Sequence, residues 1–164
     1  MYTIICDASI EPVNPGGLIA WAYVVKDKTG TFFQKNGYSP FSPENTNNMG
    51  EYHAIIAALL WLIKLPKKEQ IPATIKSDSQ LVINQLTGDF QTRTEKLIKL
   101  RDIALKAVSR YNSDIKFMWV SRNQTLEADE LSREIYNIPD IKEELLKYKK
   151  DPLYKIFGND DIPF

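Results

Sequence analysis

The chain has a single cysteine, a single histidine and no net charge: 21 basic residues balance 21 acidic residues among its 164. Cys6 cannot form an internal disulfide by itself, which fits a reducing compartment, and we expect the cytoplasm. Because there is no net positive charge, a nucleic-acid partner would have to be bound by local patches rather than by the whole surface.

Long hydrophobic runs are also missing. No apolar stretch approaches the ~20 residues that span a bilayer, and the longest, residues 54–63, has the pattern of an amphipathic helix. The N-terminus opens directly into a strand-like segment, so we expect no secretory signal and no membrane association. With 43% hydrophobic residues, the chain is typical of a globular protein, and we expect a monomer.

Hydrophobic periodicity predicts an α/β protein. β-rich segments bounded by turn residues predict five strands, at 2–6, 18–26, 31–37, 73–77 and 115–120. Helical periodicity predicts helices at 47–64, 79–86, 94–111, 126–136 and 140–150. The order predicts a five-stranded mixed sheet with helices on both faces.

Four acidic residues in different local contexts carry most of the chemical information: Asp7, Glu51, Asp78 and Asp129. Asp7 and Asp78 follow predicted strands, whereas Glu51 and Asp129 fall in the opening turns of predicted helices. Side chains at these positions can converge at one edge of the sheet. Converging carboxylates repel one another unless cations neutralise them, and hard oxygen ligands favour magnesium or manganese. The sequence therefore predicts a carboxylate-lined magnesium site.

Several short motifs surround these acids. They are Asn14-Pro15-Gly16-Gly17, Thr46-Asn47-Asn48 ahead of Glu51, Asp78-Ser79-Gln80, and Ala128-Asp129. In this order and context, the chain resembles type 1 ribonuclease H, and its archaeal-type branch in particular, from about Tyr2 to Ser132. We therefore divide the chain into a catalytic domain, residues 1–138, and a C-terminal helix and tail, residues 139–164.

The resemblance implies the ribonuclease H fold and hydrolysis of the RNA strand of RNA–DNA hybrids, leaving 5′-phosphate and 3′-hydroxyl ends. It also implies two Mg²⁺ ions, with Mn²⁺ as an alternative. Asp7 would bridge both ions, Glu51 and Asp78 would bind one, and Asp129 the other. Taken singly, each acid could instead be a helix N-terminal charge or a loop carboxylate.

The same resemblance implies residues that contact the hybrid. Those matching Asn14, Asn48 and Gln80 read the minor groove, where 2′-hydroxyls distinguish RNA from DNA, and Thr46 and Asn47 lie by the backbone. Amide side chains suit a hydroxyl because they both donate and accept hydrogen bonds. Asn14 could equally be a turn residue, and Asn47 or Asn48 a helix N-cap.

The chain departs from the family in three places. The loop before Asp129 lacks the histidine that many members carry and has Arg122 instead, which can hold a phosphate or be an ordinary surface residue. His53, the chain's single histidine, we interpret as structural or surface-exposed. Thr125 stands where relatives place an asparagine, and we expect its hydroxyl to cap the last helix of the catalytic domain.

The third departure concerns basic residues. The basic protrusion of well-known bacterial members is absent, and a charged stripe follows one side of the helix at 94–111. It consists of Lys96, Lys99, Lys106 and Arg110. The stripe is either a solvated helix face or a ridge that binds the nucleic-acid backbone.

The chain ends in Asp160, Asp161, Ile162, Pro163 and Phe164, which resembles the acidic tip of bacterial single-stranded DNA-binding proteins. That resemblance implies recruitment of replication or repair proteins through Phe164, whose ring and carboxylate suit an apolar pocket with a basic rim. The alternative is a tail that packs on its own domain or frays.

Other functions on the same fold class stay open. A non-catalytic hybrid-binding module is the main alternative, although such a module would normally have lost an acid. Integrases and transposases usually end in glutamate on the last helix, an interpretation that Glu127 and Glu130 keep open. Proofreading exonucleases carry Asp-x-Glu on the first strand, where this chain has Asp7-Ala8-Ser9.

Overall fold

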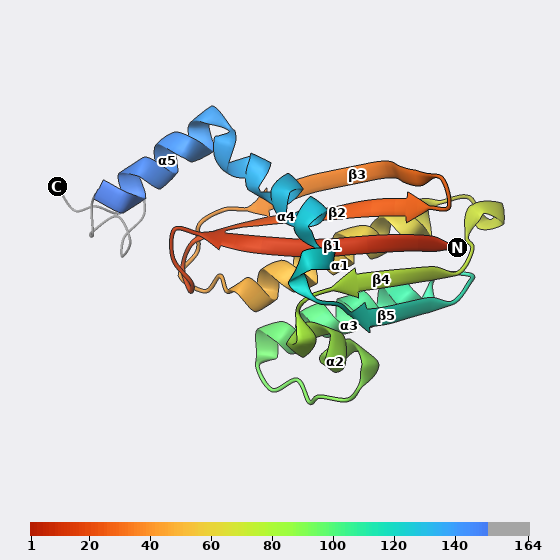
Figure 1. Cartoon of the computed structure of the whole chain (residues 1–164). Coiled ribbons are helices and arrows are strands. Elements are labelled where there is room, and N and C mark those ends of the chain that lie inside the picture. The colour runs from red at the N-terminus through yellow and green to blue at the C-terminus, as the bar shows by residue number, and fades with distance from the viewer. Residues whose placement is uncertain (151–164) are drawn as a thin grey trace.

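A computed structural model describes residues 1–150 as a five-stranded mixed sheet with strand order β3-β2-β1-β4-β5 (Figure 1). β1, β2 and β3 form an antiparallel meander, whereas β4 runs parallel to β1, and β5 parallel to β4. The strands are β1 (Tyr2–Glu11), β2 (Leu18–Asp27), β3 (Gly30–Ser39), β4 (Ala73–Ser77) and β5 (Ile115–Trp119). The predicted mixed sheet is confirmed.

Helices cover both faces of this sheet. α1 and α3 pack on the face that presents Ile4 and Cys6, and α4 packs on the face that presents Ile5. Figure 1 shows α4 in front of the sheet, with α1 and α3 behind it. The helices are α1 (Asn47–Lys64), α2 (Gln80–Thr87), α3 (Glu95–Ser109), α4 (Leu126–Arg133) and α5 (Pro139–Lys150), with 3-10 turns η1 (Lys67–Glu69), η2 (Arg122–Gln124) and η3 (Glu134–Asn137).

Two predicted boundaries were wrong. The first strand does not end at Cys6 but continues to Glu11, because β2 pairs with it as far as Glu11–Leu18. The helix expected at 126–136 ends at Arg133 and tightens into η3. Pro139 explains why η3 ends at Asn137, since a proline disfavours the helical conformation of the residue before it, here Ile138, which is extended.

α5 packs on the body of the molecule rather than standing apart from it. Ile141 and Leu145 are buried together with Leu18, Ala20 and Ile135. The division at residue 138 stays a prediction, and the tail residues 160–164 lie outside the described part of the chain. None of the helices within residues 1–150 is long and apolar enough to cross a membrane.

Candidate active site

The unequal lengths of β1 and β4 create the site. β1 pairs with β4 only as far as Ile5–Lys76, although β1 itself runs on to Glu11. Asp7 therefore lies within β1, just beyond the end of its parallel neighbour, and not at the end of its strand as predicted. Asp78 immediately follows β4, as predicted. Both carboxylates thus reach the edge where β4 stops.

Glu51 comes to this edge from α1. The helix begins at Asn47, with Thr46 as its N-cap, so Glu51 lies in the second helical turn and not in the first as expected. A Cβ atom added to Gly50 would lie 2.9 Å from Ile19 and 3.0 Å from the Cβ of Ala8. The absent side chain thus lets α1 approach β1 and β2 closely, which draws Glu51 toward Asp7.

Three carboxylates converge as a result. Asp7, Glu51 and Asp78 each offer an oxygen within 4.8 Å of the others, and Asp7 and Glu51 are buried. Burial and the neighbouring Asp78 and Asp129 raise the pKa of Asp7 to about 8, with Arg122 opposing. Burial, Asp7 and Asp78 also raise the pKa of Glu51, against hydrogen bonds from the Ser77 hydroxyl and the Ala8 backbone N–H.

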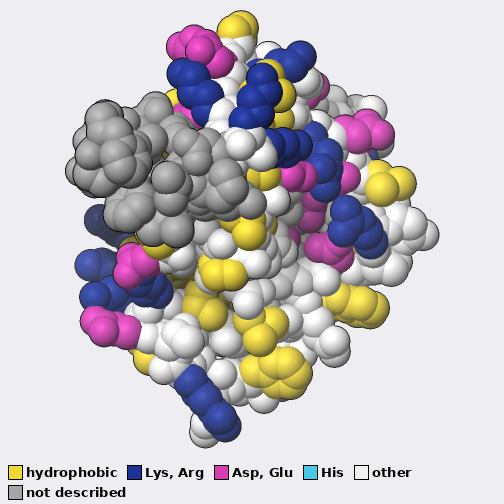
Figure 2. Space-filling model, turned by 90° about the vertical axis from the view of Figure 1, so that its left-hand side faces the viewer, with side chains coloured by type: hydrophobic (Ala, Val, Ile, Leu, Met, Phe, Trp, Pro, Cys, Tyr) yellow, Lys and Arg dark blue, Asp and Glu magenta, His cyan; other side chains and the backbone are white. Residues whose placement is uncertain are grey.

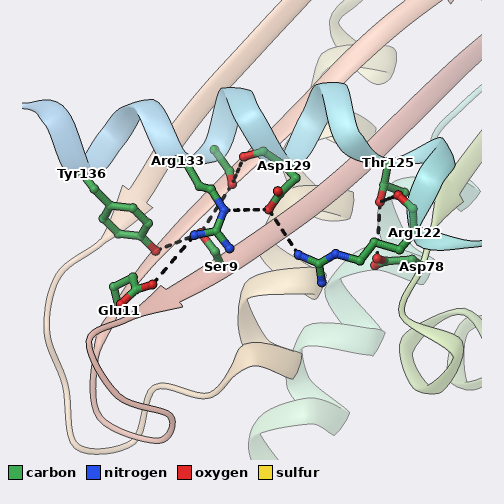
Figure 3. A network of polar contacts seen from close by, with 9 residues as sticks. Ser9, Glu11, Asp78, Arg122, Thr125, Asp129, Arg133 and Tyr136 are labelled. Atoms are coloured by element: carbon green, nitrogen blue, oxygen red, sulfur yellow. Dashed lines mark hydrogen bonds and ion pairs between the residues drawn. The ribbon is translucent and has the colours of Figure 1, made fainter.

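The fourth acid reaches the same centre from α4. Asp129 lies close enough to accept a hydrogen bond from the protonated carboxyl of Asp7. Arg133, one turn later, donates from Nε to Asp129 Oδ1 at 3.0 Å, and Arg122 lies 3.8 Å from that oxygen (Figure 3). Two arginines therefore hold Asp129 beside the other three acids.

Thr125 has a different role from the one expected. Its hydroxyl does not cap α4. The buried hydroxyl instead shares its single hydrogen between Asp78 Oδ2 at 3.3 Å and the Arg122 carbonyl oxygen at 3.0 Å (Figure 3). The predicted cap was wrong because the preceding 3-10 turn η2 directs the hydroxyl back toward β4. Thr125 thus links the loop that carries Arg122 to Asp78.

A hollow of about 300 Å³ opens over these acids. Asn14, Asn47 and Arg122, predicted to contact substrate, line it together with Asp7, Glu51 and Asp78. The Asn14 side chain accepts a hydrogen bond from the Asn47 backbone N–H at 3.2 Å, which joins the turn after β1 to the start of α1. Figure 2 looks onto this end of the molecule, where acidic side chains are bordered by basic ones.

The remaining predicted contacts lie at helix starts outside that lining. Thr46 accepts from the Met49 backbone N–H, Asn48 is half-buried in the first turn of α1, and Gln80 is exposed at the start of α2. His53 lies within hydrogen-bonding distance of the Ser39 hydroxyl, 3.0 Å from Nδ1, and does not line the hollow. The substrate roles of Thr46, Asn48 and Gln80 stay predictions, as does the structural or surface role of His53.

Three site residues were not identified from the sequence. Ser9, buried on β1, lies 2.9 Å from the Tyr136 hydroxyl and 3.5 Å from the Ser132 hydroxyl. Ser77, the last residue of β4, donates to Glu51 Oε2 at 3.3 Å. Arg133 had a sequence signal, because residues four apart share a helix face and oppositely charged pairs at that spacing attract. The two serines carry no comparable signal.

The residues fit a divalent cation. Their donors are carboxylate oxygens, the ligands that hard cations prefer. Two of the three clustered carboxylates are buried and have raised pKa values, so they repel one another when ionised. A cation among them would relieve this repulsion, and Asp129 lies beside Asp7 to complete the set.

Comparisons with known proteins agree with this architecture. Bifunctional protein Rv2228c of Mycobacterium tuberculosis and the uncharacterized protein Mb2253c of Mycobacterium bovis are each 34% identical to this chain over 89 residues. The match covers 54% of this chain and 23% of each relative, so this chain spans only a fraction of the length of those proteins.

Three solved structures share the fold. The RNase H1 of the halophilic archaeon Halobacterium salinarum is 25% identical, with a TM-score of 0.72, over 83% of this chain and 97% of that one. LC11-RNase H1, solved in complex with an RNA/DNA hybrid, is 23% identical, with a TM-score of 0.74, over 82% and 95%. The N-terminal RNase H domain of M. tuberculosis Rv2228c is 22% identical, with a TM-score of 0.68, over 91% and 99%.

A family model described as reverse transcriptase-like matches residues 8–135, most of the described chain. The matched region contains Glu51, Asp78 and Asp129, together with every polar residue predicted to contact substrate. Asp7 lies one residue before it. This chain therefore belongs to the reverse transcriptase-like family, in the fold of type 1 ribonuclease H.

Proposed function

We propose that this chain is an endoribonuclease that hydrolyses the RNA strand of RNA–DNA hybrids and leaves 5′-phosphate and 3′-hydroxyl ends. The observation that carries the proposal is the meeting of Asp7, Glu51 and Asp78 in one hollow, with Asp129 beside Asp7. A non-catalytic binding module would have no use for carboxylates whose burial and mutual repulsion raise the pKa of Asp7.

The cofactor in this proposal is a pair of Mg²⁺ ions, with Mn²⁺ as the alternative, bound by the four acids. When bound, such ions activate a water and neutralise the charge on the leaving oxygen. The chain's own residues fix the geometry: Ser77 orients Glu51, Thr125 orients Asp78, and Arg133 orients Asp129.

Polar residues around the acids would hold the hybrid. Asn14, in the lining of the hollow, and Asn48 and Gln80, at helix starts, would pair with 2′-hydroxyls through their amide groups. Thr46 and Asn47 would lie by the nucleic-acid backbone. The exposed guanidinium of Arg122 can hold a phosphate. Such contacts read backbone and sugar, so we expect cleavage to be largely independent of sequence. The similar LC11-RNase H1 was solved with such a hybrid, which supports this substrate class.

The cellular setting is part of the proposal too. We expect a cytoplasmic monomer that acts on hybrids formed during DNA replication. We also expect residues 160–164 to recruit replication or repair proteins, in the manner of the tip that they resemble. Deletion of Phe164 should abolish capture of such partners and leave hydrolysis by the purified protein intact.

Asp7→Asn tests the catalytic proposal. The substitution keeps the side-chain volume but removes the charge at the centre of the cluster, so hydrolysis of a labelled RNA–DNA hybrid should fall at least a thousandfold. Binding of the same hybrid should survive, because backbone and 2′-hydroxyl contacts remain. Gel analysis of cleavage and fluorescence anisotropy measure the two quantities.

Asp89→Asn is the matched control, because Asp89 is an exposed aspartate after α2 that does not line the hollow. It should cleave the hybrid at the wild-type rate. Substantial turnover by Asp7→Asn would contradict the assignment of the four acids. A wild-type protein that binds hybrids but cleaves none with Mg²⁺ or Mn²⁺ would establish the binding module instead.

A further inference from the structure

A second concave surface lies away from the catalytic hollow, on the face of the sheet that α1 covers. α1 packs over β1 and β2 and leaves the edge strand β3 partly open. Between them lies a pocket of about 280 Å³, here called the aromatic pocket. Its lining consists of Trp21, Tyr23, Phe33, Lys35, Ala57, Leu60, Trp61 and Lys64.

The sequence builds the walls of this pocket with specific choices. Trp21 on β2 is paired with Gly37 on β3, and a Cβ at Gly37 would lie 2.2 Å from the Trp21 ring. The glycine therefore lets the indole lie across the backbone of β3. On the opposite wall, Phe33 stacks on Trp61 with ring centroids 5.4 Å apart. Both walls are thus aromatic.

The rim of the pocket is exposed and apolar. Phe33 is 37% exposed and Leu60 is 43% exposed. Phe32, which packs on Trp61 from the strand side, is 47% exposed. Adjacent exposed rings of this kind are typical of a binding surface, because exposing a contiguous apolar patch to water costs free energy that a bound partner would recover. None of these residues belongs to the catalytic hollow.

Two lysines add positive charge to this apolar surface. Lys35 on β3 and Lys64 at the end of α1 are exposed members of the lining. Throughout residues 1–150, neither takes part in an ion pair. The pocket therefore suits a ligand that combines an apolar anchor with negative charge.

This chain contains such a segment. We propose that the aromatic pocket binds residues 160–164 of this chain when no partner protein holds them, with the phenyl ring of Phe164 or the side chain of Ile162 between the aromatic walls. The carboxylates of Asp160 and Asp161 then lie by Lys35 and Lys64. Pro163 restricts the backbone of the segment and lowers the entropy lost on binding.

Single-stranded nucleic acid fits this surface less well, although it too combines rings and negative charge. Proteins that bind single strands offer open aromatic faces along a basic groove, on which successive bases stack. Here Trp61 already stacks on Phe33, and two lysines flank a compact pocket rather than an extended track. A short peptide with one or two apolar anchors is the better match.

Peptide binding to the full-length Phe164→Ala chain tests the proposal, since this variant keeps the whole fold but lacks the anchor of its own segment. A fluorescein-labelled peptide of residues 156–164 should bind with a micromolar Kd, measured by fluorescence anisotropy. Replacement of Phe164 by Ala, or of both aspartates by Lys, in the peptide should weaken binding at least tenfold.

On the protein side, Lys35→Glu with Lys64→Glu, added to Phe164→Ala, should cause a similar loss while hybrid cleavage stays at the level of the parent. Lys116→Glu with Lys142→Glu is the charge-matched control, because both lysines are exposed and lie outside the pocket. No binding by the native peptide, or equal effects of the two lysine pairs, would overturn the proposal. So would a labelled dT oligonucleotide that binds where the peptide does not and whose binding requires Lys35 and Lys64.

Discussion

At the scale of single residues, the buried carboxylates make stability depend on pH. The folded-state pKa of Asp7 is about 8, and that of Glu51 is also raised, whereas unfolded carboxylates titrate near 4. Between those values the folded state of the metal-free protein binds more protons than the unfolded state. Its free energy of unfolding must therefore fall as pH rises through this window.

We expect urea unfolding in EDTA to show a lower midpoint at pH 8 than at pH 5. Asp7→Asn, which cannot ionise, should flatten this slope and raise the midpoint at pH 8, whereas Asp89→Asn should follow the wild type. Excess Mg²⁺ should restore the wild-type midpoint at pH 8, because a ligand of the folded state stabilises it. If the pH dependence of the midpoint is the same in Asp7→Asn as in the wild type, ionisation of Asp7 does not destabilise the folded state.

Thr125→Val tests the orientation of Asp78. The valine keeps the shape but removes the hydroxyl that donates to Asp78 and to the Arg122 carbonyl. We expect a loss of about 1 kcal/mol in stability and a several-fold higher Mg²⁺ concentration for half-maximal cleavage. Thr125→Ser should recover the Mg²⁺ dependence, and Thr87→Val, at an exposed threonine of α2, should leave it unchanged. Equal losses in the serine and valine variants would reduce Thr125 to a packing role.

The site residues that could be predicted from the sequence lie in motifs, whereas those that could not are brought to the site by the fold. Asp7, Glu51, Asp78 and Asp129 stand in recognisable motifs, and each reaches the site or its immediate border. Ser77 escaped prediction because a serine at a strand end is ordinary, and only the fold brings it to Glu51. Motifs mark the ligands, whereas the residues that orient the ligands are identified by contact alone.

At the scale of elements, strand length decides the chemistry. The polar residues after Cys6 led us to predict that the first strand ends there. The partner β2 extends it to Glu11 through backbone hydrogen bonds, which do not depend on the type of side chain. β4 has only β1 and β5 beside it and ends at Ser77. The difference in length opens the edge where helix α1 and both strands contribute an acid. No local pattern encodes that difference.

α5 provides a test of packing between elements. Ile141 and Leu145 are buried against Leu18 and Ala20 of β2, so Leu145→Ala should leave a cavity and lower the free energy of unfolding by about 2–3 kcal/mol. Leu146→Ala is the control, because this neighbouring leucine on the same helix is 49% exposed and its truncation should change stability little. Thermal unfolding measures both. Equal, small effects would mean that α5 adds nothing to the stability of the body.

At the scale of the whole molecule, the zero net charge poses a problem for the proposed substrate. The acidic hollow repels a phosphate backbone, and the global charge offers no compensation. Positive charge must therefore be concentrated locally. The periodicity of α3 correctly separated its packing side, where Leu97, Leu100, Ala104 and Val108 contact the core, from its basic side. What the basic side binds cannot follow from periodicity, because a solvated face and a binding ridge have the same pattern.

The ion pairs of the stripe bear on the choice between a solvated face and a binding ridge. Lys96 and Lys99 already pair with Glu44 and Glu95, whereas Lys106 and Arg110 form no ion pair with any residue in the described range. If the stripe binds the backbone, Lys99→Glu with Lys106→Glu should weaken hybrid binding about tenfold in low salt. The slope of log K against log salt concentration should become shallower by about two, roughly one unit for each phosphate that the protein no longer neutralises.

Lys67→Glu with Lys68→Glu is the control for this prediction. It carries the same charge change on η1, which precedes the start of β4 at the opposite end of the strand from Asp78. This control should lower affinity little and keep the wild-type slope. Identical slopes for the two double variants would show that the stripe is only a solvated helix face. Arg122 would then be the main phosphate ligand beside the acids.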